Sequence, residues 1–202
     1  MEKINLKLIS DYSELEWLKN SLTPWPEIGH LQLSSIIPSG HQSYVAVRCS
    51  NSDPKIGPVG TLDYEKLFKY LQKFTSSPEV CFSALWNGFG WDVESELPQF
   101  FENLNFQNYK LFELPNRAYY VFSGPLLENL KMGHKLGEIF FFEPSNLIWP
   151  EDRSWFLAKE IDFDVCLIGG SNQLINEIVD SGLFICEKFN PEQTTNSMYI
   201  CG

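Results

Sequence analysis

Three carboxylates, Glu160, Asp162 and Asp164, recur at every second position late in the chain. Side chains alternate between the two faces of an extended segment, so all three are expected to project from one face. Carboxylate oxygens are the ligands that Mg²⁺ and Ca²⁺ prefer, and the pattern therefore predicts a divalent-cation site. The solvated face of a half-buried strand gives the same spacing, because adjacent like charges are tolerated in water.

The segment just before these carboxylates concentrates charge, tryptophan and proline between Trp149 and Trp155. Arg153 lies between the two tryptophans, where its guanidinium group can stack on an indole ring and pair with a carboxylate. This is the chemistry of a binding surface, and we predict that Trp149, Arg153 and Trp155 contribute to one. An arginine that fastens a loop to its own domain has the same signature.

A second cluster of aromatic residues, Trp86, Phe89 and Trp91, surrounds two glycines at positions 88 and 90. Exposed aromatic side chains are anchors for peptides, sugars or protein partners, and glycine permits a close approach of the backbone. We therefore predict a second binding segment here. The alternative is that these aromatic residues cover the core.

The sequence Gly169-Gly170-Ser171 separates a predicted strand from a predicted helix. Backbone N–H groups at such a junction can bind an anion. The lysine of a Walker A loop and the third glycine of a dinucleotide-binding fingerprint are both missing, however. The segment therefore predicts a tight strand-to-helix turn.

The composition favours one globular domain over residues 1–202, because 44% of the residues are hydrophobic and 15% are aromatic. The net charge is −11, and the first 74 residues hold eight acidic and eight basic side chains, so all of the excess lies later. An acidic chain without a basic run disfavours nucleic acid and anionic membranes as partners. A basic protein partner suits this charge, as does a role in solubility.

The five cysteines are scattered and form no Cys-x-x-Cys pair, which favours a reduced cytoplasmic location over a disulfide scaffold or a zinc site. The first residues lead into no apolar signal segment, and no apolar run reaches the ~18 residues of a membrane span. Apart from a divalent cation at the three carboxylates, we expect no cofactor.

Local signals set the ends of three predicted helices. Asp11 and Glu14 have the spacing of a capping box, while Asp63 and Ser171 are good N-cap residues. Gly182 is a natural stop for the helix that Ser171 begins. Predicted helices cover residues 12–22, 63–76, 98–104 and 171–181. Predicted strands cover residues 31–37, 44–49, 80–86, 109–114, 118–123, 165–168, 184–189 and 198–201. Residues 139–142 and 155–161 are two further apolar runs.

Helices and strands are mixed without a regular βαβ alternation. This order predicts an α+β fold in a single domain, with a mostly antiparallel sheet and three to four flanking helices. Strand order does not follow from one sequence, because nothing local fixes which strands pair.

The later part of the chain carries a pattern that can be written WPxDRxW, EIDF and GGS. These motifs lie at residues 149–155, 160–163 and 169–171, with a further matching stretch at 114–126. In this pattern the chain resembles a family of bacterial proteins of about this length that has no established activity. The resemblance implies a bacterial cytoplasmic protein with one compact domain. In size, charge and layout the chain is also similar to SUKH-type immunity proteins, which are acidic α+β proteins that bind toxins.

Our leading hypothesis from the sequence is a non-enzymatic, immunity-like protein-binding domain that uses the two aromatic clusters against a basic partner. One alternative is a metal-assisted hydrolase, in which the three late carboxylates hold the ion and Arg153 stabilises charge. Another is a small-ligand or carbohydrate-binding protein built on the segment around Trp86.

Overall fold

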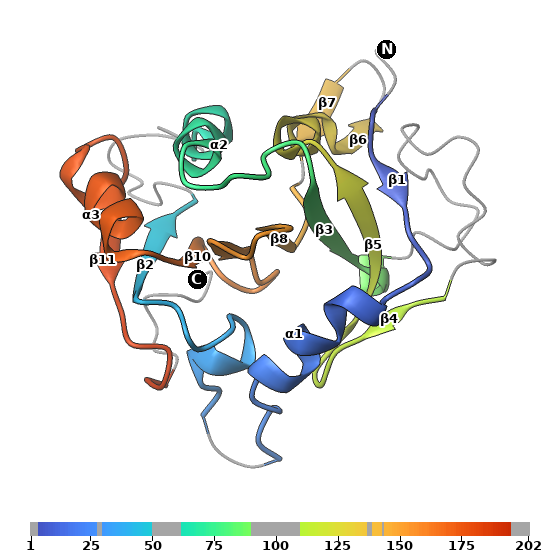
Figure 1. The fold of residues 1–202 in the computed structure, drawn as a ribbon, viewed down its shortest axis with the longest axis horizontal. Coiled ribbons are helices and arrows are strands. Elements are labelled where there is room, and N and C mark those ends of the chain that lie inside the picture. The colour runs from blue at the N-terminus through green and yellow to red at the C-terminus, as the bar shows by residue number, and fades with distance from the viewer. Residues whose placement is uncertain are drawn as a thin grey trace.

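The computed structural model describes residues 4–27, 30–49, 62–89, 110–136, 139–142 and 144–194. Its α+β fold is confirmed, with strands that pair antiparallel throughout the described sheets (Figure 1). The helices are η1 (Ser13–Leu15), α1 (Glu16–Ser21), η2 (Leu33–Ser35), α2 (Tyr64–Gln72), η3 (Asn87–Phe89), η6 (Leu126–Lys131) and α3 (Asn172–Asp180), where η denotes a 3₁₀ helix. The strands are β1 (Lys7–Leu8), β2 (Ser43–Arg48), β3 (Cys81–Trp86), β4 (Phe112–Glu113), β5 (Ala118–Gly124), β6 (Gly133–Leu136), β7 (Ile139–Phe142), β8 (Leu147–Pro150), β9 (Phe156–Ala158), β10 (Val165–Gly170) and β11 (Cys186–Lys188).

One large sheet organises the fold, in the order β1-β5-β3-β8-β9-β10-β2-β11, and β4 also pairs with β5. The strands β6 and β7 form a separate hairpin. The centre of the sheet is built from the late strands β8, β9 and β10, which lie between the early strands β3 and β2 (Figure 1). This order brings segments distant in the sequence together, because β8 pairs with β3 and β10 pairs with β2.

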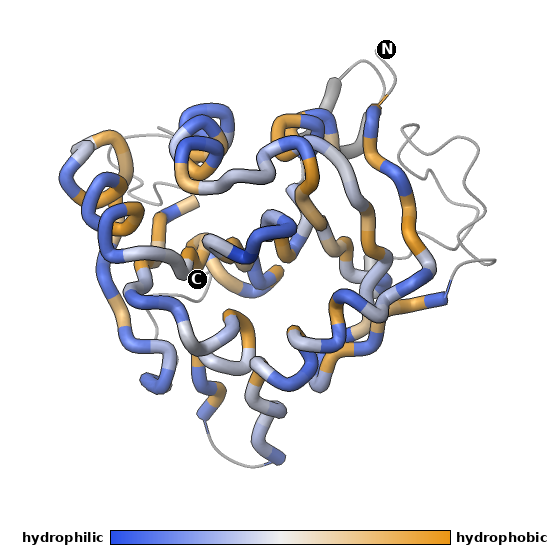
Figure 2. Tube along the Cα trace, in the orientation of Figure 1, coloured by the Kyte–Doolittle hydropathy of each residue, from blue (hydrophilic) through white to orange (hydrophobic). Residues whose placement is uncertain are grey.

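Each face of the sheet is covered by helices. Alternate residues of a strand point to opposite faces, so Ile148 and Leu157 pack with α2 and α3 on one face. Their neighbours Trp149 and Phe156 pack with α1 on the other face. Figure 1 shows α1 on the opposite side of the sheet from α2 and α3. In Figure 2 the helices α2 and α3 carry both hydrophilic and hydrophobic residues, as expected for helices with one face on the sheet.

The helix ends show which local signals hold in the fold. The Asp63 side chain accepts a hydrogen bond from the Lys66 N–H at 2.9 Å and caps α2, as predicted. The Ser171 hydroxyl accepts one from the Leu174 N–H at 3.1 Å and caps α3. Gly182 has φ of +65° just beyond α3, a left-handed conformation that glycine adopts without strain. Both caps and the stop signal are therefore confirmed.

The predicted capping box at Asp11 lies before the short 3₁₀ helix η1 and does not cap α1. Its carboxylate accepts a hydrogen bond from the Ser13 N–H two residues later, which makes a local turn. A 3₁₀ turn follows, and α1 begins only at Glu16.

The predicted strand at residues 31–37 is wrong. The Ile37 N–H bonds back to the Leu33 carbonyl at 3.0 Å, and the segment forms η2 instead. The N–H groups of Leu33 and Ser34 bond to the carbonyls of Gln193 and Pro191. These tertiary contacts satisfy the backbone, so the segment needs no strand partner.

The predicted elements at residues 98–104 and 198–201 lie outside the described residues. None of the described helices is long and apolar enough to cross a membrane.

Candidate functional site

Trp149 and Trp155 do not contribute to a binding surface, because their side chains are only 1% and 0% exposed. Trp149 lies in β8 with its indole between the rings of Phe82 and Phe156, at centroid distances of 5.7 and 5.4 Å. Trp155 comes just before β9 and packs into the opposite core, beneath α2 and α3. The prediction of a surface made by these two tryptophans is therefore wrong. The two residues flank a hairpin, and both faces of the sheet are covered there.

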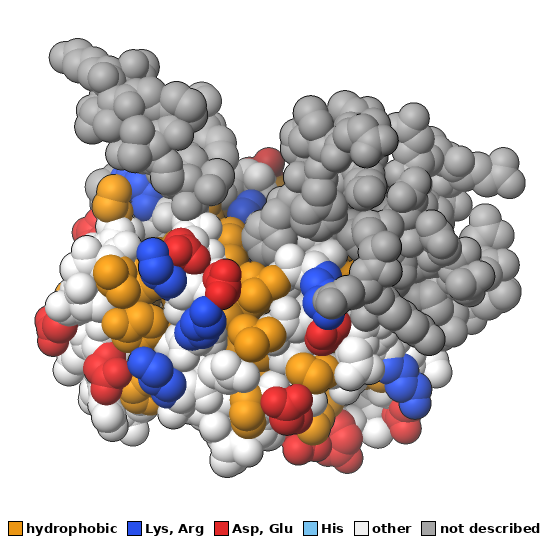
Figure 3. All heavy atoms as spheres, turned by 90° about the horizontal axis from the view of Figure 1, so that it is seen from above, with side chains coloured by type: hydrophobic (Ala, Val, Ile, Leu, Met, Phe, Trp, Pro, Cys, Tyr) orange, Lys and Arg blue, Asp and Glu red, His pale blue; other side chains and the backbone are white. Residues whose placement is uncertain are grey.

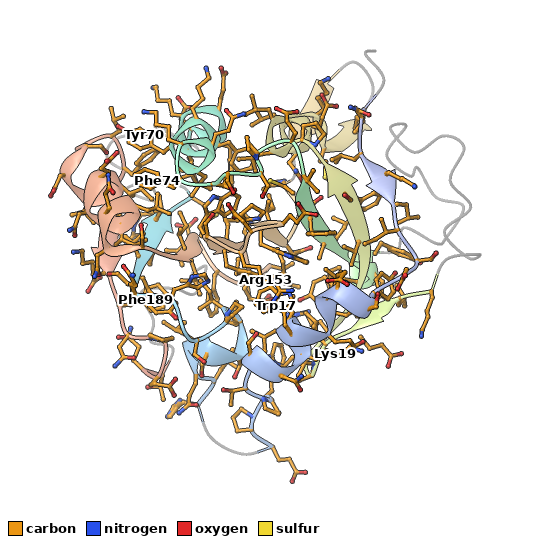
Figure 4. All side chains as sticks on the ribbon, in the orientation of Figure 1. Trp17, Lys19, Tyr70, Phe74, Arg153 and Phe189 are labelled. Atoms are coloured by element: carbon orange, nitrogen blue, oxygen red, sulfur yellow. The ribbon has the colours of Figure 1, made fainter. Side chains whose placement is uncertain are left out.

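Arg153 lies exposed at the tip of this β8–β9 hairpin, with φ of +56°. Its guanidinium group stacks on the indole of Trp17, 4.7 Å from the ring centroid (Figure 4). It also donates a hydrogen bond to the Glu14 carbonyl. The predicted stacking on an indole is confirmed, but the indole belongs to α1. Both contacts are within the chain, so Arg153 fastens the hairpin to the first helix.

Asp152, beside Arg153, fastens the same hairpin to the connection between α2 and β3. Its carboxylate accepts hydrogen bonds from the Ser76 N–H at 2.7 Å, the Ser76 hydroxyl at 2.8 Å and the Thr75 hydroxyl at 2.9 Å. Partial burial opposes ionisation, but hydrogen bonds from Ser154 and Ser76 outweigh it and lower the pKa of Asp152 to about 2.

This lowered pKa predicts a pH-dependent effect of Asp152→Asn. The folded pKa lies below the unfolded value of ~3.9, so the ionised carboxylate stabilises the fold above about pH 4. That contribution disappears as the pH falls towards 2. We expect the variant to lose ~1 kcal/mol at pH 7, since the bonds are partly exposed, and less at pH 3. Urea unfolding at both pH values measures this loss. Asp180→Asn is the charge-matched control, because Asp180 is exposed at the end of α3. An equal loss at both pH values would contradict it.

Glu160, Asp162 and Asp164 do not share one face, so the predicted metal site is not formed. The Phe163 N–H bonds to the Glu160 carbonyl at 3.1 Å, which makes this segment a turn rather than a strand. The Glu160 side chain is buried, whereas that of Asp162 is 74% exposed. Within the described parts of the chain, no three His, Cys, Asp or Glu residues lie close enough together to hold a metal ion.

The buried Glu160 carboxylate instead forms an ion pair with Arg117, which lies between two predicted strands and was not predicted to be a site residue. Arg117 ends the loop between β4 and β5, where the Leu114 N–H bonds to its carbonyl at 2.9 Å. Burial raises the pKa of Glu160, and the Arg117 charge and the Ile161 N–H only partly oppose this effect. Burial and the nearby Glu160 carboxylate also raise the pKa of Tyr119. The site is therefore a buried ion pair in a poorly hydrated environment.

Two tryptophans frame the Arg117 guanidinium group. It lies 4.6 Å from the ring centroid of Trp86, at the end of β3, and 5.1 Å from that of Trp25, in the connection between α1 and η2. Trp86 is partly buried, while Trp25 is 40% exposed. Cations attract the faces of aromatic rings, and the attraction strengthens when water is excluded. The arrangement joins four segments that are distant in the sequence.

Asn116 fixes the position of Trp25 beside this arginine. Its side-chain oxygen accepts a hydrogen bond from the Trp25 N–H at 2.6 Å. Its side-chain nitrogen donates to the carbonyls of Thr23 at 3.1 Å and Ser35 at 2.9 Å. These bonds fasten the tip of the β4–β5 hairpin to the connection between α1 and η2, at Thr23 and Trp25, and to Ser35 in η2.

A small pocket opens beside the ion pair. It is lined by Trp25, Arg117, Asn146, Lys159 and Glu160 among others, and its volume of about 20 Å³ holds roughly one water molecule. The Asn146 side chain accepts a hydrogen bond from the Trp86 N–H at 2.9 Å and donates one to the Lys159 carbonyl at 3.3 Å. A pocket this small does not enclose an organic ligand, so recognition here has to use the surrounding surface.

The predicted aromatic segment contributes to the site only through Trp86. A Cβ atom at Gly88 would lie 2.0 Å from the Trp86 ring, so only glycine lets this indole fold back over the backbone. The close approach at Gly88 is therefore made by a side chain of the same chain. Phe89 ends η3, and nothing is described of its side chain, while Trp91 lies outside the described residues.

Comparison with known proteins identified no relative of this chain. Neither protein-family models, nor curated proteins, nor solved structures gave a match to this chain.

Proposed function

We propose that this protein is a non-enzymatic binding module that recognises a basic protein partner through the surface around Trp25. This Trp25 surface consists of Trp25, Trp86, Arg117 and Asp162. An immunity protein that neutralises a basic toxin in a bacterial cytoplasm belongs to this class of binder. Nucleic acids and anionic membranes do not suit it as partners, because the chain carries a net charge of −11.

The exposure of Trp25 is the observation that carries this proposal. A tryptophan that is 40% exposed leaves a large apolar area in water, and such residues are frequent anchors of protein interfaces. Few other large apolar side chains of the described chain are exposed to this degree, the largest fractions being those of Leu183 and Ile185. Trp25 differs from these two because it is aromatic and lies beside charged groups.

The position of Trp25 is fixed before any partner arrives. Its backbone is bonded to Asn116 and its ring contacts the Arg117 guanidinium group, 5.1 Å from the ring centroid. Binding therefore has little side-chain or backbone entropy left to remove at this residue. Preorganised aromatic residues of this kind contribute more to affinity than mobile ones.

The exposed Asp162 carboxylate near Trp25 suits a cationic partner group. The Asp162 carboxylate is 74% exposed and lies 3.9 Å from the Arg117 guanidinium group, so it has further capacity for a second cation. A lysine or arginine of the partner can pair with Asp162 while its stem covers the Trp25 ring. The acidic net charge of the whole chain accelerates the approach of such a partner.

Replacing Trp25 with alanine tests this proposal. The tagged protein is used to capture partners from a lysate of its own source, and the affinity of each purified partner is then measured. We expect Trp25→Ala to weaken binding by about 30-fold, the effect of a hot-spot residue of ~2 kcal/mol. We also expect the wild-type affinity to fall as salt is raised from low to moderate concentration.

Leu183→Ala is the matched control, because Leu183 is another exposed apolar residue and follows α3, away from the Trp25 surface. It should leave the affinity unchanged. A partner that binds both variants as tightly as the wild type would show that recognition occurs elsewhere. An acidic partner, or binding that strengthens with salt, would contradict the charge argument.

A further inference from the structure

Cys49 and Cys166 bring their sulfur atoms to within 3.3 Å of each other, although 117 residues separate them in the sequence. Cys166 lies in β10 opposite Val47 of β2, and Cys49 follows two residues after Val47. The two cysteines are therefore diagonal neighbours on the same face of an antiparallel pair. The Cys49 N–H bonds to the Asp164 carbonyl at 2.8 Å, which continues the pairing to this point.

A tyrosine hydroxyl completes the cluster. Tyr64, the first residue of α2, places its oxygen 3.1 Å from the Cys166 sulfur and 3.7 Å from the Cys49 sulfur. The Leu62 N–H bonds to the Cys49 carbonyl at 2.7 Å and so brings the start of α2 to this place. Two thiols and a phenol thus lie in mutual contact at the edge of the core beneath α2.

The two thiols differ in accessibility and in acidity. Cys166 is completely buried, whereas Cys49 is half-buried. The hydrogen bond from Cys166 lowers the pKa of the Cys49 thiol more than its burial raises it, and Tyr64 adds to the lowering. Burial holds the pKa of Cys166 well above its usual value. Oxidants react with accessible thiolates, so Cys49 is the thiol that reacts first.

We propose that Cys49 and Cys166 are a redox-sensitive pair, in which a hydroperoxide oxidises Cys49 and Cys166 then closes a disulfide. This modification site is independent of the function proposed for the Trp25 surface. Side-chain contact between the two sulfurs, with one accessible and one buried, is the arrangement of an attacking and a resolving cysteine.

The chemistry balances in two steps. The Cys49 thiolate attacks one oxygen of hydrogen peroxide, the O–O bond breaks, and the leaving hydroxide takes up a proton as water. The Cys166 sulfur then attacks the sulfenic acid sulfur of Cys49 and displaces a second hydroxide, which takes the Cys166 proton and leaves as water. Two thiols have lost two electrons in total, and one peroxide has been reduced to two waters. Tyr64 can hydrogen-bond to either sulfur during these steps.

The bond requires the two sulfurs and the backbone around Cys49 to move closer to β10. A disulfide has an S–S distance of ~2.05 Å, so the sulfurs must approach by a little over ~1 Å from their present separation. Diagonal neighbours of an antiparallel pair have Cα atoms ~7–8 Å apart, so closing the bond also draws the end of β2 towards β10. The product fastens the end of β2 to β10 covalently.

Cys186 can be compared directly with Cys166 as a second possible partner of Cys49. It lies in β11 opposite Val47, on the other side of β2, so it is diagonal to Cys49 as well. Its thiol is also half-buried, and burial raises its pKa. Register alone would therefore allow two pairs, and the sulfur contact selects Cys166.

The test is to oxidise the reduced full-length protein with a few equivalents of hydrogen peroxide, block the remaining thiols in acid and map the peptides. We expect a Cys49–Cys166 cross-link, a mass loss of about 2 Da and full reversal by dithiothreitol. Cys186→Ser should cross-link as the wild type does. Cys166→Ala should instead accumulate a sulfenic acid at Cys49, detected with dimedone. In urea the preference for the Cys49–Cys166 pair should disappear.

Three results would overturn the proposal. They are a Cys49–Cys186 bond in the folded wild type, oxidation of Cys49 without any cross-link, and a Cys49–Cys166 yield no higher in the native protein than in urea. The wild-type peptide map decides each of these, so the proposal does not depend on the stability of the variant at the buried position 166.

Discussion

Replacing Trp149 with alanine is expected to lower the free energy of unfolding by about 3–5 kcal/mol, the largest effect of any single change discussed for this protein. The indole is 1% exposed and lies between two parallel rings, with interplanar angles of 24° to Phe82 and 12° to Phe156. Trp17 of α1 contacts it edge-on at 6.5 Å. Alanine would leave a cavity that these rigid rings cannot fill.

Urea unfolding at pH 7 measures this loss, and Trp25→Ala is the matched control. The same truncation at a 40% exposed position should cost only ~1 kcal/mol, chiefly through the lost contact with Arg117. The control also shows whether the variant used for partner binding is folded. Equal losses for the two variants would mean that Trp149 is not the centre of the core.

Arg117→Ala is expected to cost about 3 kcal/mol at pH 7, because it leaves the Glu160 carboxylate buried without its counter-charge. Burial already raises the pKa of Glu160, and loss of the arginine removes the main opposing influence. A carboxyl group whose folded pKa is raised destabilises the fold increasingly as the pH rises from its unfolded pKa to its folded pKa, and fully above the folded pKa. The loss should therefore be greater at pH 7 than at pH 5, where more of the buried carboxyl group is protonated.

The double variant Arg117→Ala/Glu160→Gln separates charge from packing. Glutamine keeps the shape of Glu160 but carries no charge, so the double variant should be more stable at pH 7 than Arg117→Ala alone. Its stability should also change less between pH 5 and pH 7. If the changes in unfolding free energy of the two substitutions simply add, the buried carboxylate is not the source of the loss. The packing of Arg117 against the two tryptophans would then account for it.

The parts of this fold that the sequence predicts are those set by neighbouring residues. Asp63 and Ser171 cap helices through hydrogen bonds that span three residues, and Gly182 ends a helix through its own backbone conformation. Such signals need no knowledge of the remaining chain. Strand order has no local signal, because the pairing of β8 with β3 joins residues more than sixty positions apart.

The two tryptophans at 149 and 155 show why a local pattern misidentified the surface. Between them lie Glu151, Asp152 and Arg153, which are indeed exposed at the hairpin tip. Trp149 faces one side of the sheet, and Trp155 packs into the core on the other side. Burial of both depends on α1, α2 and α3, which are contributed by other parts of the chain. The sequence pattern identified the hairpin but not what covers it.

The site around Arg117 could not be assembled from the sequence for a related reason. Its arginine, its carboxylate and its two tryptophans come from the β4–β5 loop, the turn after β9, the end of β3 and the connection after α1. The spacing of Glu160, Asp162 and Asp164 indicated a shared face, but the turn at Phe163 separates them. The one signal for this site in the sequence was the adjacent pair Asn116 and Arg117 in the short loop between two predicted strands.

The hydrogen bonds of Asn116 restrict which residues position 116 can accept. Its side chain must accept one hydrogen bond, from Trp25, and donate two, to the carbonyls of Thr23 and Ser35. Aspartate has the right length but no donor, and it would face two carbonyl oxygens. Glutamine has both functions but is one methylene too long for a tip held by backbone pairing on both sides. The primary amide of asparagine is thus the one side chain whose chemistry and length satisfy all three partners.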